Sequence, residues 1–197
     1  PAKSGRFYVK TNESNGNVPA SSFKNCAELK YVYDAGLVDS PLQPVTVGSS
    51  AFEGCKKLIN IPLKKATTIG AKAFMGCEEL VCIDDYTVEG ITKKVLWVVA
   101  EDIKTEAFSG CKKLVYVYFQ NAKTVEDKIL YGTTALREVK FDKAFTSGTV
   151  KASNDTFGAA TNIILYVAAD QVGVDGKKLS IKDGVANNSI TFASIEQ

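Results

Sequence analysis

The amino-acid sequence predicts a β-rich solenoid, in which short repeats stack as the coils of one continuous body. Two observations predict it: one motif returns six times along the chain, and the copies end in runs that alternate apolar and polar residues. A unit of about 20 to 30 residues cannot bury its apolar face alone, so it must pack against its neighbours. Because the runs are rich in β-branched and aromatic residues, we expect them to form a parallel sheet.

The repeated motif has an aromatic residue or leucine first, a small residue three places later and an aliphatic residue six places later. The first residues stand at positions 23, 52, 74, 108, 130 and 157, and the spacing of 22 that separates two pairs of copies is the bare coil. Four copies share Phe, Cys and Leu in register: Phe23, Cys26, Leu29; Phe52, Cys55, Leu58; Phe74, Cys77, Leu80; and Phe108, Cys111, Leu114. Two looser copies follow: Leu130, Thr133, Leu136 and Phe157, Ala160, Ile163.

Each position of the unit has a predicted place in the coil. The clearest copies read I-G-x-x-A-F-x-G-C-x-x-L-x-x-I-x-L, and we expect the aliphatic, Ala, Phe, Cys and Leu positions to point inward. Charged pairs between them, such as Lys56-Lys57 and Glu78-Glu79, are expected in solvent. The glycine before the cysteine is expected to permit a tight or left-handed turn.

This unit closely resembles the BspA-like leucine-rich repeat, also called the Treponema-type repeat, which is found in bacterial surface proteins. The resemblance spans residues 18–167 and weakens in the last copies, where Leu130 replaces Phe and Thr133 replaces Cys. It implies a right-handed leucine-rich-repeat solenoid with a parallel β-sheet on one face and irregular or short helical turns on the other. It also implies a secreted or cell-surface location and the binding of host or neighbouring-cell proteins.

Four of the five cysteines, Cys26, Cys55, Cys77 and Cys111, fill the same slot of the repeat. Equivalent positions on neighbouring coils lie about 4.8 Å apart, but their side chains point the same way rather than toward each other. Free Cys packs as a small hydrophobe, and a chain without His lacks the usual zinc partner. We therefore expect a ladder of reduced, buried thiols. Cys82 lies outside the slot and is either a reactive thiol or a half-exposed strand residue.

The spacing of 34 between the third and fourth copies places extra residues near 85–99. These predict a β-hairpin that turns at Glu89-Gly90 or Thr92-Lys93, and that either decorates a binding face or packs Trp97 over the core. Residues 35–44 hold Pro41 and Pro44 and predict a loop. We expect residues 1–17 to be an N-terminal cap or truncated repeat, with a strand at 6–10, and residues 168–197 to be a C-terminal cap that ends in a strand at 189–195.

Composition and motifs argue against several functional classes. The net charge of +2 over 197 residues is too small for a surface that follows nucleic-acid phosphates, and no apolar run reaches the roughly 20 residues that cross a bilayer. No His is present for a conventional catalytic triad, and no phosphate loop, dinucleotide fingerprint or calcium loop occurs. We therefore expect neither an enzyme nor a cofactor. The start at Pro1, without a signal-like apolar stretch, suggests a mature or trimmed form.

The candidate site is the outward face of the predicted sheet. Tyrosine supplies a large contact area with a polar tip, which suits recognition, although tyrosine is also simply a good strand former. The residues expected on this face are Tyr31, Tyr33, Asn60, Asp84, Tyr116, Tyr118, Glu138 and Lys140, with Pro62 and Cys82 in the same pattern and Trp97 from the insertion.

Three functions remain open from the sequence. The first is a non-catalytic recognition or adhesion module whose sheet face binds a host matrix or cell-surface protein. The second is glycan binding, with Tyr116, Tyr118 and Trp97 as stacking platforms and Asp84 or Asn60 as hydrogen-bonding groups. The third is a spacer without a ligand. A concave groove would favour the glycan, a broad shallow face would favour a protein, and a face covered by the hairpin would favour the spacer.

Overall fold

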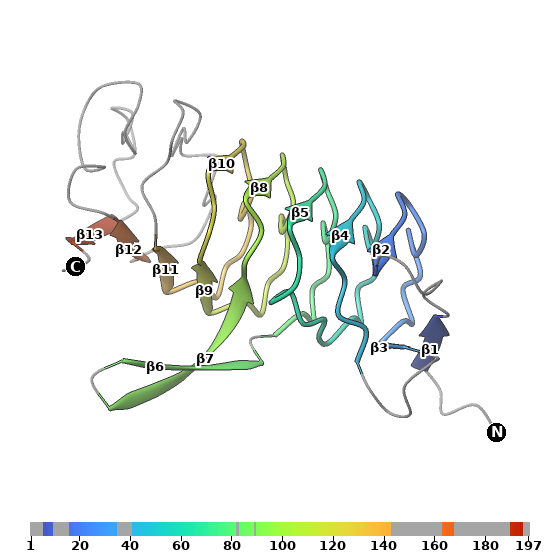
Figure 1. Ribbon diagram of the computed structural model, residues 1–197, viewed down its shortest axis with the longest axis horizontal. Helices are drawn as coiled ribbons and strands as arrows, with labels where there is room; N and C mark the ends of the chain where they lie inside the picture. The colour runs from blue at the N-terminus through green and yellow to red at the C-terminus, as the bar shows by residue number, and fades with distance from the viewer. Residues whose placement is uncertain are drawn as a thin grey trace.

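The structure, a computed structural model, describes residues 6–9, 16–34, 41–81, 83–88, 90–142, 163–167 and 190–194 (Figure 1). Within these ranges all the regular elements are strands. They are β1 Arg6–Val9, β2 Asn17–Val18, β3 Tyr31–Asp34, β4 Thr46–Val47, β5 Thr68–Ile69, β6 Asp84–Val88, β7 Ile91–Val98, β8 Asp102–Ile103, β9 Tyr116–Phe119, β10 Thr124–Val125, β11 Glu138–Phe141, β12 Ile163–Val167 and β13 Ile190–Ser194.

The coils stack side by side and build a solenoid, as the repeat predicts (Figure 1). One face carries a six-stranded sheet in the order β13-β12-β11-β9-β7-β6, where all neighbours are parallel except β6 and β7. On the same side, β1 pairs in parallel with β3 at the N-terminal end. The predicted parallel sheet on one face is confirmed, and no helix occurs in the described residues.

A second sheet, which the sequence analysis missed, runs along the opposite side of the solenoid. It is parallel, has the order β10-β8-β5-β4-β2, and takes only two residues from each coil, so we call it the narrow sheet. Two residues are too short for an alternating pattern to be read from the sequence. The turns add a third run of coil-to-coil bonds, in which each repeat Phe N–H donates to the following coil at 2.7 to 2.8 Å, as from Phe23 to Ala51 and from Phe52 to Ala73.

The repeat phenylalanines form the centre of the core. Phe52, Phe74 and Phe108 are fully buried, and the rings of Phe23, Phe52, Phe74 and Phe108 stack nearly parallel with centroids 5.1 to 5.3 Å apart. Such offset stacking adds about 0.5 to 1.5 kcal/mol per pair to the area that the rings bury. The Ala, Cys and Leu positions of the second, third and fourth copies are also fully buried, which confirms the predicted inward positions.

The cysteine slot holds free thiols, as predicted. Cys55, Cys77 and Cys111 are buried, Cys26 at the first coil is half-buried, and all four are free. Each buried thiol donates to the carbonyl of the Phe in the preceding coil, at 2.9 Å from Cys55 to Phe23 and at 3.2 Å in the next two coils. Burial raises the pKa of Cys55 to about 12 and raises the pKa of Cys77 above its usual range, so these thiols stay protonated.

The predicted hairpin and the predicted loop before the second coil lie outside the repeat core. β6 and β7 pair antiparallel around residues 89 and 90, the first of the two turns considered. Of the predicted loop at residues 35–44, the structure describes only 41–44, where Pro41 forms a bridge with Tyr33 and the Leu42 N–H donates to the Val32 carbonyl at 3.0 Å. Cys82, the sixth-copy residues Phe157 and Ala160, and residues 168–189 lie outside the described residues.

We expect Phe74→Ala to lower the free energy of unfolding by about 3 to 5 kcal/mol, because it leaves a cavity between two stacked rings. Phe23→Ala is the matched control, since Phe23 is half-buried and stacks on one described ring only. Denaturant unfolding followed by circular dichroism measures both. Equal losses for the two variants would contradict a continuous ring stack.

We expect Gly76→Ala to destabilise the fold by about 1 to 2 kcal/mol, because residue 76 has φ +72°, which an L side chain adopts at a cost. Space is not the cause, since an added Cβ would only reach ordinary contact at 3.9 Å. Gly76→Asn is the control: Asn25 fills the same slot in the first coil with φ 61°, so Asn should cost less than Ala. Equal losses would point to crowding rather than backbone strain.

Candidate functional site

The predicted site residues alternate with buried residues, as expected for the outward side of a sheet. Tyr31, Tyr33, Asn60, Asp84, Tyr116, Glu138 and Lys140 are half-buried, whereas Val32, Ile61, Val117 and Val139 between them are buried. The pairing of β9 with β11 sets Tyr116 beside Glu138 and Tyr118 beside Lys140. Tyr31 and Tyr33 lie on β3, with their ring centroids 6.2 Å apart. The predicted residues thus form two groups on one side of the solenoid (Figure 1).

The β6–β7 hairpin lies across the second of these groups. β7 joins the sheet beside β9 only over Leu96–Val98, and its first half leaves the sheet together with β6. From there, Lys93 reaches the carboxylate of Glu138 on β11, with both oxygens 2.7 Å from Nζ. Tyr86 on β6 accepts a hydrogen bond from Lys140 at 2.5 Å. Both contacts therefore fasten the hairpin to β11, on the face that it crosses.

Three aromatic rings fill the space between the hairpin and the sheet. Tyr86 lies 4.9 Å from Tyr118 and 5.8 Å from Trp97, and Trp97 lies 5.0 Å from Tyr118, all between ring centroids. The Trp97 indole N–H donates to Gln120 at 2.9 Å. Trp97 thus packs on the outer side of the sheet and not over the solenoid core. We call Tyr86, Trp97 and Tyr118 the aromatic cluster.

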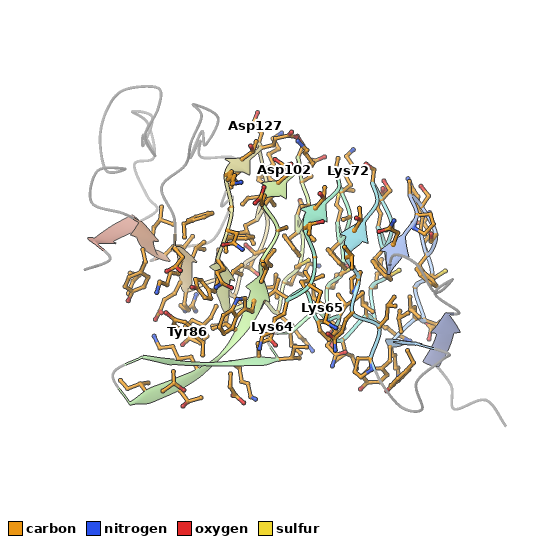
Figure 2. All side chains as sticks on the ribbon, viewed as in Figure 1. Lys64, Lys65, Lys72, Tyr86, Asp102 and Asp127 are labelled. Atoms are coloured by element: carbon orange, nitrogen blue, oxygen red, sulfur yellow. The ribbon has the colours of Figure 1, made fainter. Side chains whose placement is uncertain are left out.

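Lysines cover the remaining ring faces of the cluster. Lys64 lies 4.6 Å from the Trp97 ring and pairs with Asp84 at 3.0 Å, and Lys140 lies 5.2 Å from the Tyr118 ring. Figure 2 shows Lys64 and Tyr86 near one another where the hairpin leaves the coils, far from Asp102 and Asp127 at the narrow sheet. Such cation–π contacts contribute about 0.5 to 2 kcal/mol each. The cluster is therefore held by charges as well as by apolar contact.

The electrostatics of this site follow from burial and from its ion pairs. Burial, with a hydrogen bond to Asp142, raises the pKa of Tyr118 well above its usual range, so its hydroxyl stays neutral. The hydrogen bond to Glu138 raises the pKa of Lys93, which keeps this side chain cationic. No group of three or more metal-ligating side chains occurs in the described residues. The arrangement supplies contact surface and fixed charges.

Tyr118 and Trp97, two of the predicted binding residues, are less accessible than the sequence suggests. Tyr118 points outward as expected, but only 5% of it is exposed because the hairpin covers it. Trp97 offers neither ring face freely, since Tyr86, Tyr118 and Lys64 surround it. The sequence analysis missed Tyr86 and Lys93 as partners of the face. The sequence did hold a signal for them: side chains alternate between the two faces of a hairpin, and Tyr86 and Lys93 are paired across β6 and β7, so they share one face.

Comparison with known proteins supports the repeat and gives no closer relative. A family model described as a BspA type leucine rich repeat region, with 6 copies, matches residues 91–164. No curated protein and no solved structure matches the chain. The matched range begins in the hairpin, although the coils before it share the same Phe stack and cysteine slot. No helix of the described residues is both long and apolar enough to span a bilayer.

We expect Tyr86→Ala to expose the indole of Trp97, because Tyr86 packs edge-on against it and fastens the hairpin to Lys140. Trp97 is the single Trp of the chain, so its fluorescence reports on this site alone. The emission should shift to longer wavelength and acrylamide quenching should rise. Tyr86→Phe keeps the ring and should change the emission little. Thr87→Ala, at the exposed residue next to Tyr86, is a second control. Unchanged quenching in Tyr86→Ala would contradict a docked hairpin.

Proposed function

Since the BspA type leucine rich repeat model matches residues 91–164, we propose that the chain is a non-catalytic recognition module that binds a protein partner through its sheet face. Leucine-rich-repeat solenoids generally mediate protein interactions, and BspA-type repeats are commonly associated with surfaces. The partner we propose is a host matrix or cell-surface protein. The location we propose is outside the cell, in a secreted or cell-surface bacterial protein.

One observation carries this proposal: the outward tyrosines form a broad contact surface and do not present isolated exposed ring faces on which a sugar would stack. Tyr31 and Tyr33 are half-buried and lie beside each other, and Asn60 is half-buried on the neighbouring coil. Tyrosine rings with accessible polar tips provide large contact areas at low entropic cost in protein interfaces. A broad face of this kind suits a folded protein surface.

The glycan hypothesis loses its main support. Sugars stack on exposed aromatic faces, but those of Trp97 and Tyr118 are occupied by the aromatic cluster and by Lys64 and Lys140. Asp84, the proposed partner for a sugar hydroxyl, is already paired with Lys64. A glycan would therefore have to displace several contacts.

The spacer hypothesis keeps one specific observation in its favour, which is the cover that the hairpin gives to Tyr118. The contacts that fasten the hairpin lie on β11, whereas the Tyr31–Tyr33 pair lies on β3 at the N-terminal end of the solenoid (Figure 1). The two hypotheses thus differ in what they predict for the N-terminal part of the face.

We expect Tyr31→Ala/Tyr33→Ala to weaken binding to a panel of purified extracellular-matrix proteins by about tenfold or more, as removal of interface tyrosines does. Surface plasmon resonance against the panel and a glycan array measures this effect. Tyr131→Ala is the control, because Tyr131 is 47% exposed in a turn away from the sheet. Equal binding by wild type and the double variant would move the site elsewhere, and no binding by wild type would favour the spacer.

A further inference from the structure

The hairpin ends the six-stranded sheet, and its outermost strand has a free edge. β6 is the terminal strand, and it pairs only with β7 among the residues that the structure describes. In Figure 1, the hairpin projects beyond the row of coils. A terminal strand presents a row of backbone N–H and C=O groups that a further strand can pair with. The chemistry that recognises this row is an extended polypeptide backbone.

β6 lacks the proline, the lysine and the bulge that often protect an exposed edge. Its sequence, Asp84-Asp85-Tyr86-Thr87-Val88, contains neither proline nor lysine, and its five pairs with β7 are consecutive, so no bulge twists the edge away. Its two carboxylates are matched within the chain: Asp84 pairs with Lys64 at 3.0 Å and Asp85 pairs with Lys94 at 2.8 Å. Charge repulsion therefore does little to keep another strand away.

The same edge is held in a fixed position before any partner arrives. Tyr86 in the middle of β6 packs on Trp97 and Tyr118 and bonds to Lys140, while Lys93 on β7 is paired with Glu138. A binding strand that is already ordered loses little conformational entropy on association. Next to it, Ile91 at the tip is 61% exposed, although most large apolar side chains of the described residues are buried.

We infer that the free edge of β6 is a docking site for an extended, proline-free segment of a protein partner, which adds to the hairpin as one more strand. This inference rests on the proposed recognition function and names the edge along which the partner's backbone lies. Main-chain hydrogen bonds supply the affinity in this mode, and alternate side chains supply the preference. Beside the exposed Thr87, the partner strand favours Thr, and apolar residues face the Ile91 end.

The test uses a phage-displayed library of random heptapeptides, selected on the whole chain. We expect the recovered peptides to lack proline at their central positions, and synthetic versions to bind about tenfold more weakly to Thr87→Lys, because an edge lysine opposes strand addition. Thr92→Lys is the matched control: Thr92 faces Thr87 across the hairpin, and both variants lose the same 2.9 Å hydrogen bond and gain the same charge, but Thr92 lies on β7.

Hydrogen exchange gives the second readout. Amides of β6 that point away from β7 should exchange quickly in the free chain and slowly with bound peptide, and a peptide with one central N-methylated residue should lose both binding and protection. Failure to recover peptides, equal binding to both lysine variants, or protection elsewhere would each overturn the inference. These results leave binding of the matrix-protein panel through Tyr31 and Tyr33 untouched, so the two proposals fail separately. If the free chain forms dimers and Thr87→Lys abolishes them, the strand that adds to β6 belongs to a second copy of this chain, which would overturn the inference of a partner segment.

Discussion

Every coil of this protein depends on the one beside it, and the stacked rings of Phe23, Phe52, Phe74 and Phe108 express this dependence most directly. A single coil has no interior of its own, so each ring is buried only by its neighbours. Backbone hydrogen bonds on three sides of the coil repeat the same spacing. Each buried thiol adds one hydrogen bond to the coil that precedes it. Side chains and backbone therefore impose one common register.

The hairpin is the exception to this register, and it is also where the surface chemistry gathers. Twelve residues beyond the bare coil of 22 allow β6 and the first half of β7 to leave the stack and fold back across β9 and β11. Fastened by Lys93 and Tyr86, the hairpin converts part of a flat sheet into a layered site. The coils before it keep their outward tyrosines half-exposed. One insertion thus divides the sheet into a covered part and an accessible part.

The repeat, the inward positions, the left-handed glycine before the cysteine and the outward side of each strand could be predicted, because each follows from a period within the sequence. The burial of Tyr118 could not, since it depends on where the hairpin folds back, a contact between residues far apart in the chain. The narrow sheet was also beyond prediction, because two residues per coil carry no period. Local pattern determined the coil, and long-range contact determined the site.

The direction of the hydrogen bonds between coils has a mechanical consequence. In parallel sheets they run across the strands, so here they point along the axis on which the coils stack. A pulling force along that axis loads neighbouring coils in series, and each junction opens by itself while the others hold. The protein therefore lengthens under tension in small successive steps, as a chain of weak links does, rather than breaking at one strong joint.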